Sequence, residues 1–366
     1  MIALPSLKRP SSEDIKRTLF TIAVAGVGGW VAALVGVPLP WMIGAMLATT
    51  VFALFAIAPA GIAVRSPMEF RTVMVPVIGV MLGSSFTPEI VEQMAGWWIT
   101  ITGLLVFIGL SLATIFVLYR RVFGFDTPTA YFAALPGGVI EAALLGEQAG
   151  GDSRTISLIH FCRILLAVLT IPIAMRLIFG PVGSSAISAD AYDTALTALD
   201  VLLLIGAGIV GFQIAKWLRM PGAPLTGPMI VSAIVHVLGW TYATPPTVIV
   251  VAAQIVMGAS LGARFAGYSI DQAKLAIRAA AVGVSIMLLI GISMSLALLP
   301  FVDETLTAMI LAFAPGGLAE MSLIALSLQV GVAFVAAHHV IRISLTMILS
   351  PIAYRMFIDK DADLTR

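Results

Sequence analysis

Apolar segments of membrane-spanning length recur along almost the whole chain. A helix needs about 20 predominantly apolar residues to cross the hydrocarbon core of a bilayer. The segments that meet this requirement or come close to it are 18–36, 39–58, 72–88, 97–119, 154–178, 199–216, 223–241, 246–263, 279–300 and 330–354. The pattern predicts an all-α integral membrane protein.

Two further apolar segments are interrupted by the same tripeptide. Residues 128–150 and 304–328 each contain Pro-Gly-Gly. Proline obstructs a helix and lacks a backbone donor, and glycine adopts backbone conformations closed to other residues. Irregular backbone at membrane depth is tolerated only where protein or a water-filled cavity satisfies its polar groups. We therefore expect a broken or re-entrant helix at Pro136, Gly137 and Gly138, and another at Pro315, Gly316 and Gly317.

Composition agrees with this pattern and excludes other classes of protein. The 366 residues are 60% hydrophobic and 11% charged, whereas soluble domains are about 25% charged. The scarcity of charge excludes a soluble domain and a disordered chain. A net charge of +1 without a basic cluster excludes direct binding of nucleic acid. A single cysteine, Cys162, excludes an intrachain disulfide, and we expect no metal and no cofactor.

The second half of the chain repeats the chemistry of the first. The block AALPGGVIEAALL at 133–145 matches AFAPGGLAEMSLI at 312–324. The spacing between these blocks also separates His160 from His339 and Arg163 from Arg342. The chain holds only four histidines, so chance similarity between apolar segments does not explain this match. We interpret the chain as an internal duplication.

Positive charges predict opposite orientations for the two halves, because lysine and arginine favour cytoplasmic loops. In the first half they lie before the first span and after the second and fourth spans. In the second half they lie after its first, third and last spans. Opposite parity requires an odd number of crossings in each half. We predict two inverted repeats of about five spans each, plus a broken or re-entrant PGG helix per repeat, with the N- and C-termini in the cytoplasm.

A second topology stays open. If each PGG segment crosses the membrane fully, the two repeats run parallel. That arrangement would place Lys216, Arg219, Arg264, Lys274 and Arg278 outside the cell, against the charge rule.

The predicted organisation of the chain follows from these segments. It comprises a cytoplasmic N-terminal segment at 1–17, membrane repeat 1 at 18–180, a polar connection at 181–198, membrane repeat 2 at 199–354 and a cytoplasmic tail at 355–366. The polar start of the chain lacks a signal-peptide layout, so we expect the first span to be retained.

A glutamate in apolar surroundings follows each PGG break. Glu141 and Glu320 each come five positions after the proline. A carboxylate deep in a membrane is costly and usually marks an ion or proton pathway. Half-helices that begin at the breaks would present free N–H groups and a positive dipole end. We predict a cradle for an anionic or polar solute, with the glutamates as proton carriers or cation ligands; a structural role beside the arginines stays open.

An H-x-x-R pair lies near mid-depth of the span that follows each break. Arg163 is about nine residues into its span, roughly 14 Å along the helix axis, and Arg342 lies at a similar depth. Because arginine stays charged, each needs an acceptor, and the two intramembrane glutamates are the obvious candidates. His160 and His339 share a helix face with the arginines. We predict that the pairs bind a carboxylate or phosphate; a structural Arg–Glu lock is the alternative.

The PGG-x-x-E blocks, the H-x-x-R spans and the pair PLPWMIGAM and PGAPLTGPM resemble the bacterial membrane AbrB family. Members of this duplicated family are often labelled ammonia monooxygenase or AbrB family transcriptional regulator. The resemblance extends from about residue 20 to 354 and implies a fold related to cation/proton antiporters, in the bacterial inner membrane. It supplies no substrate and no catalytic residues.

These observations favour a secondary transporter of a small anionic or zwitterionic solute, coupled to protons or cations. A membrane sensor that affects gene expression indirectly is the alternative, and a membrane oxidoreductase is a weaker one. Each repeated histidine lies near an arginine that would repel a metal ion, so we do not expect an enzyme. The expected partners are the solute and the lipid bilayer, without nucleic acid; a homodimer is left open.

Overall fold

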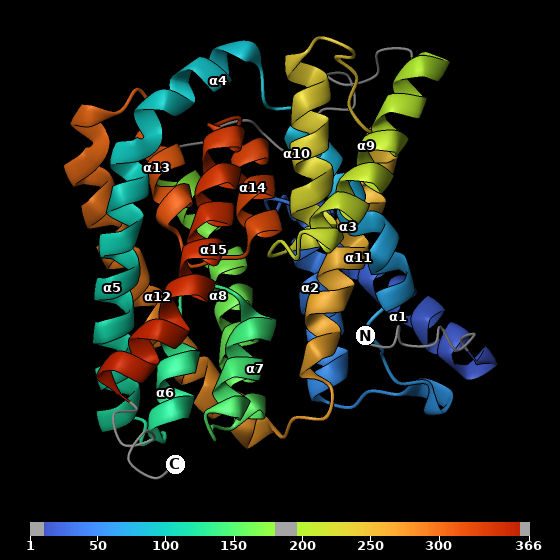
Figure 1. Cartoon of the computed structure of the whole chain (residues 1–366). Helices are drawn as coiled ribbons and strands as arrows, with labels where there is room; N and C mark the ends of the chain where they lie inside the picture. The colour runs from blue at the N-terminus through green and yellow to red at the C-terminus, as the bar shows by residue number, and fades with distance from the viewer. Residues whose placement is uncertain (1–10, 180–195, 359–366) are drawn as a thin grey trace.

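A computed structural model describes residues 11–179 and 196–358, and within these ranges the chain consists of helices and short turns without a strand (Figure 1). Seven helical segments in the described ranges are long and apolar enough to cross a membrane. They are Ser12–Leu34, Pro88–Arg121, Ser153–Ile178, Ala198–Trp217, Thr247–Phe265, Ile270–Phe301 and Val332–Phe357. The prediction of an all-helical, multi-span membrane protein is confirmed.

The first half contains eight α-helices in the described residues. They are α1 (Ser12–Leu34), α2 (Pro40–Leu54), α3 (Met68–Gly83), α4 (Pro88–Met94), α5 (Trp98–Arg121), α6 (Thr127–Ala134), α7 (Val139–Gln148) and α8 (Ser153–Phe179). The helix α1 begins before the predicted boundary at residue 18. Ser11 and Asp14 form a capping box there, so the polar residues before the apolar run already belong to the helix.

The second half contains seven α-helices and the 3-10 helix η4 before α12 in the described residues. Its elements are α9 (Ala198–Trp217), α10 (Ala223–Val237), α11 (Thr247–Gly262), η4 (Ala263–Phe265), α12 (Ile270–Leu298), α13 (Leu306–Phe313), α14 (Leu318–Ser327) and α15 (Val332–Phe357). Most of the predicted connection at 181–198 and of the predicted tail at 355–366 lies outside the described residues.

Three of the predicted spans form short helices. The helices α2 and α10 have 15 residues each and α3 has 16. These lengths correspond to roughly 22–24 Å, less than the hydrocarbon core of about 30 Å. The expected span 39–58 stops early because Ala56 adopts a positive φ of 48°, which ends the helix.

The helices pack as two bundles that each draw on both halves of the chain (Figure 1). One bundle contains α1, α2, α3, α9, α10 and α11. The other contains α5 to α8 and α12 to α15. The bundles meet where α3 contacts α14 and α15, and where α2 and η4 contact α8. The two halves therefore interleave, and neither forms a separate unit.

Glycines set the close helix crossings of the first bundle. A Cβ added at Gly44 of α2 would overlap the backbone of Gly28 in α1, and one added at Gly227 of α10 would overlap Gly211 in α9. Small residues allow helix backbones to approach closely in a membrane. The same crossing therefore occurs once in each half.

The third helix of each half packs on the second helix of the other half. A Cβ at Gly79 of α3 would lie 2.5 Å from the carbonyl oxygen of Leu225 in α10. A Cβ at Gly258 of α11 would meet the carbonyl oxygen of Met42 in α2. These reciprocal contacts join the halves inside one bundle.

Candidate functional site

Both PGG segments turn back on themselves as helical hairpins. The backbone N–H of Asp152, just after α7, donates to Thr129 Oγ1 at the start of α6 at 2.8 Å. In the second half, a Cβ at Gly331, just after α14, would lie 3.0 Å from Ala308 Cβ near the start of α13. Figure 1 shows α6 and α7 at one end of the molecule and α13 and α14 at the opposite end. Both interrupted segments therefore fold back as hairpins, and the two hairpins lie at opposite ends of the molecule.

The glycine that precedes the second half-helix has a different backbone conformation in each hairpin. Gly138 precedes α7 with a φ of 62°, in the left-handed region that favours glycine. Gly317 precedes α14 in an extended conformation that any residue adopts. A Cβ at Gly317 would collide with the carboxylate of Glu320. The first glycine is therefore favoured by its backbone angle, and the second by the close approach of a carboxylate.

Arg342 forms hydrogen bonds to the backbone at the break of the second hairpin. This residue is fully buried in α15. Its Nη1 donates to the carbonyl oxygen of Ala314 at 2.6 Å, and its Nη2 donates to that of Gly316 at 2.8 Å. Nη2 also lies 2.8 Å from Nδ1 of His339, whose Nε2 lies 3.0 Å from the carbonyl oxygen of Leu311. The bonds fit a neutral histidine that donates from Nε2 and accepts at Nδ1.

The first hairpin is held by the corresponding residues of α8. Arg163 Nη1 donates to the carbonyl oxygen of Leu135, and His160 Nε2 lies 3.0 Å from that of Phe132. His160 and Arg163 are buried, as their counterparts are. Histidine and arginine residues at equivalent positions of the two repeated blocks therefore form equivalent hydrogen bonds.

The acceptors of both arginines differ from the predicted ones. Glu141 and Glu320 form no ion pair or hydrogen bond with Arg163 or Arg342 in the described residues. The last carbonyls of a helix have no intrahelical donor and carry a partial negative charge. Helix breaks create such carbonyls in the protein interior, so the guanidinium groups satisfy them instead.

The glutamates lie at the opposite, positive ends of the half-helices. Glu141 is in the first turn of α7 and Glu320 is in the first turn of α14. Glu320 is buried and Glu141 is partly buried. Arg264 and Arg71 are the cationic groups within electrostatic range of Glu320. Each carboxylate thus faces a half-helix dipole that stabilises negative charge.

The break of the first hairpin packs against α15 in the second bundle. Ideal Cβ positions at Gly137 and Gly138 would lie 3.5 Å from Ile343 and 3.6 Å from Met347, which come one and five positions after Arg342 in α15. Arg163 and Arg342 repel one another electrostatically across this region. The helix α14 in turn contacts α8. The break of the first hairpin therefore lies beside α15, the helix whose Arg342 holds the second hairpin.

Several buried polar atoms near the breaks lack a hydrogen-bond partner in the described residues. They include Nδ1 of His160 and the hydroxyl groups of Ser322, Thr346 and Ser350. Thr346 Oγ1 lies 3.9 Å from the ideal Cβ position at Gly137. No sequence pattern selects these hydroxyl groups, because serine and threonine are common in membrane helices. Their position beside the break became visible only in three dimensions.

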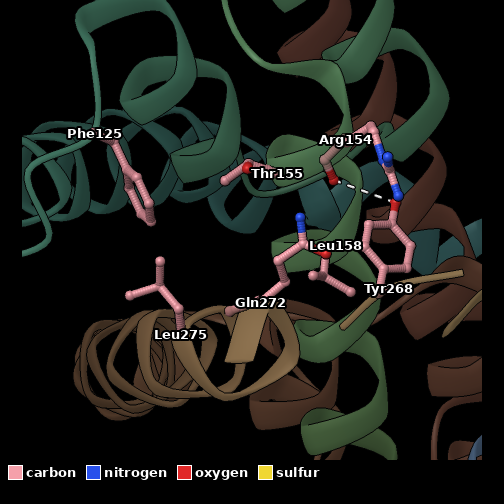
Figure 2. A pocket seen from close by; sticks show the side chains of 8 residues that line it. Phe125, Arg154, Thr155, Leu158, Tyr268, Gln272 and Leu275 are labelled. Atoms are coloured by element: carbon pink, nitrogen blue, oxygen red, sulfur yellow. Dashed lines mark hydrogen bonds between the residues drawn. The ribbon is translucent and has the colours of Figure 1, made fainter. Parts of the chain in front are cut away.

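Connections from both halves of the chain meet around Arg154 at one end of the molecule. Arg154 at the start of α8 donates from Nη2 to the carbonyl oxygen of Gly267 at 3.0 Å, and its guanidinium lies 5.2 Å from the ring centre of Tyr268. Tyr268 donates to the carbonyl oxygen of Arg154 at 3.3 Å. Figure 2 shows these residues around a cavity of about 40 Å³ with Phe125 and Gln272. The connections after α5, α7 and η4 therefore meet at this end.

The fold defines a multi-span, all-helical membrane protein with two helical hairpins broken at Pro-Gly-Gly. The profile of the family described as "Transition state regulatory protein AbrB" matches residues 41–358, and the chain belongs to this AbrB family. YhjN of Bacillus subtilis (strain 168) is 26% identical over 379 residues, which cover 94% of each chain. A protein of Escherichia coli (strain K12) named "Putative regulator AbrB" is 21% identical over 317 residues, covering 87% of this chain and 89% of that protein.

Proposed function

We infer that the protein is a secondary transporter of a small anionic or zwitterionic solute, built from two inverted repeats. The observation that carries this proposal is the shared hydrogen-bond pattern at two hairpins that lie at opposite ends of the molecule. Inverted repeats with interrupted helices are typical of secondary transporters, whose sites lie at the repeat interface.

Reciprocal packing supports the inverted repeat. The Gly28–Gly44 crossing has its counterpart in Gly211–Gly227, and the α3–α10 contact has its counterpart in the α11–α2 contact. Contacts that recur in this way are expected when two similar units are related by a two-fold axis.

The charge distribution supports a cytoplasmic location for the end that holds α6 and α7. Arg154, the connection after α5 and the connection before α12 meet there, and basic connections favour the cytoplasm. The proposal places both chain termini on this side of a bacterial inner membrane. The lipid bilayer is then a partner along the outer faces of both bundles.

The proposed roles of the site residues follow from their positions. Arg163 and Arg342 brace the hairpins and keep the centre positive, which favours an anionic group. The half-helix N-termini at Gly138 and Gly317 present backbone N–H groups to it. Glu320, with Glu141 in the other hairpin, carries the coupling proton or cation.

Flux in proteoliposomes tests the proposal. Anions and amino acids that raise the unfolding temperature identify ligands, because a ligand that binds only the native state stabilises it. We expect flux of such a ligand to depend on an imposed pH gradient, and the Glu320→Gln and Glu141→Gln substitutions to remove that dependence. A ligand that binds but is never transported would contradict transport.

That contrary result would favour the second candidate function, a membrane sensor or regulator. The name of the Escherichia coli relative describes a regulator, and the family description does the same. Membrane sensing through the same site would affect gene expression indirectly, with no need for direct contact with nucleic acid. Neither candidate requires the protein to be an enzyme.

A further inference from the structure

A pocket of about 310 Å³ lies between the two bundles. Its walls come from α7 and α8 of one bundle and from η4 of the other. Figure 1 shows that α7 lies at the end of the molecule where the basic connections meet. Neither Arg163 nor Arg342 lines this pocket. Its volume is in the lower range of small-molecule sites.

Arg264 supplies an uncommitted positive charge to this pocket. Its guanidinium lies 4.7 Å from the ring centre of Phe161 in α8. In the part of the chain that the structure describes, it makes no hydrogen bond and no ion pair within 4.0 Å. Glu320 and Arg71 act on it at longer range, with opposite signs. A half-buried arginine with unused donors is suited to bind a carboxylate in bidentate geometry.

The other lining residues add an opposite charge, hydroxyl groups and an apolar wall. Glu147 at the end of α7 is exposed and lines the same pocket, as do Ser153 and Ser157 of α8. Val139, Ile140, Ala143 and Leu144 form the apolar face of α7 that borders the pocket. The pocket therefore offers one cationic group, one anionic group and a surface for an aliphatic body.

The charged and polar residues of this pocket are not repeated at the corresponding positions of the other half. At the spacing of the repeated blocks, Arg264 corresponds to Ser85, Glu147 to Leu326, and Ser157 to Ala336. Neither charge is therefore required by the duplicated fold. Their presence at only one end of the molecule indicates a role in ligand binding there.

We propose that this pocket binds a small zwitterion with an apolar body, with its carboxylate on Arg264 and its ammonium group toward Glu147. The inference rests on the proposed transport function and narrows its solute class. The site is reached from the end that holds α6 and α7, and the solute's aliphatic part packs against α7.

Protection of an engineered cysteine from alkylation tests this site in the purified full-length protein. Ser157→Cys is combined with Cys162→Ala, since Cys162 is the single native cysteine and is buried. We expect millimolar leucine to slow N-ethylmaleimide labelling of this cysteine several-fold. Isovalerate, which lacks the ammonium group, and isoamylamine, which lacks the carboxylate, should leave labelling unchanged. If Cys162→Ala impairs folding, Ser157→Cys in the native background is compared with the unmodified protein.

Substitutions of the two charged residues of the pocket form the second part of the test. Arg264→Gln and Glu147→Gln should each abolish protection by leucine, whereas Ser85→Ala, at the equivalent position of the other half, should preserve it. Protection that survives Arg264→Gln, equal protection by isovalerate, or no protection by leucine would overturn the proposal. Leucine that protects without entering proteoliposomes would contradict transport and leave the site standing. Flux of another solute that is unchanged by Arg264→Gln would support transport and contradict a role of this pocket in it.

Discussion

Arg342 donates a hydrogen bond from Nη1 to the carbonyl oxygen of Ala314 at 2.6 Å, at the residue where α13 ends. Arg163 makes the corresponding bond to Leu135 at the end of α6. A helix that ends inside the protein leaves carbonyl groups without donors. The buried arginines supply those donors, so the breaks and the charges stabilise each other.

Replacing Arg342 with methionine should destabilise the protein more than the same change at Arg163. Arg342 forms hydrogen bonds to two carbonyl groups and to His339, whereas Arg163 forms one hydrogen bond, to a carbonyl group, in the described residues. Each buried carbonyl left without a donor costs about 1–3 kcal/mol. We expect Arg342→Met to lower the free energy of unfolding by about 3 kcal/mol and Arg163→Met by about half as much. Chemical unfolding in detergent measures both; equal losses would contradict the account.

Alanine at Gly44 or Gly227 should disrupt the crossings of the first bundle. A Cβ at either position would overlap the backbone of the neighbouring helix. Overpacking of this kind costs about 1–3 kcal/mol. Gly26 in α1 is the matched control, because a Cβ there meets nothing within 4 Å. Thermal unfolding should show a loss for Gly44→Ala and Gly227→Ala and none for Gly26→Ala; a similar loss in all three would rule out the close crossing as the cause.

Glu304 should make stability fall between about pH 5 and pH 7. Burial raises the pKa of Glu304 from an ordinary 4.5 to about 7, and the Asp303 carboxylate acts in the same direction. An acid with a higher pKa in the folded state holds its proton more tightly when folded, so raising the pH through this window destabilises the protein. Glu304→Gln should flatten the dependence of the unfolding temperature on pH, whereas the exposed Glu92→Gln should not. An unchanged slope in Glu304→Gln would refute this assignment.

The sequence supported the helical class, the family and the positions of both breaks. Pro136 and Pro315 marked the breaks because proline chemistry is local, and the repeated H-x-x-R pairs marked the helices that brace them. These predictions depended on patterns within single segments, which the structure preserves.

The partners of the charged residues could not be predicted in the same way. An arginine in a membrane needs an acceptor, and the sequence offered carboxylates as the obvious ones. The carbonyl groups of Leu135 and Ala314 become acceptors only when the helices end there. The pocket of Arg264 also depends on η4 lying against α8, a contact between bundles that no periodicity encodes.

The transport proposal depends most directly on the two hairpins entering the membrane from opposite sides. Gln148 at the end of α7 and Gln329 just after α14 are both exposed, so each is replaced by cysteine in the Cys162→Ala background. Labelling by a membrane-impermeant maleimide is then compared in inside-out and right-side-out vesicles. The account predicts that Gln148→Cys reacts only in inside-out vesicles and Gln329→Cys only in right-side-out vesicles. Labelling of both cysteines from the same side would contradict it.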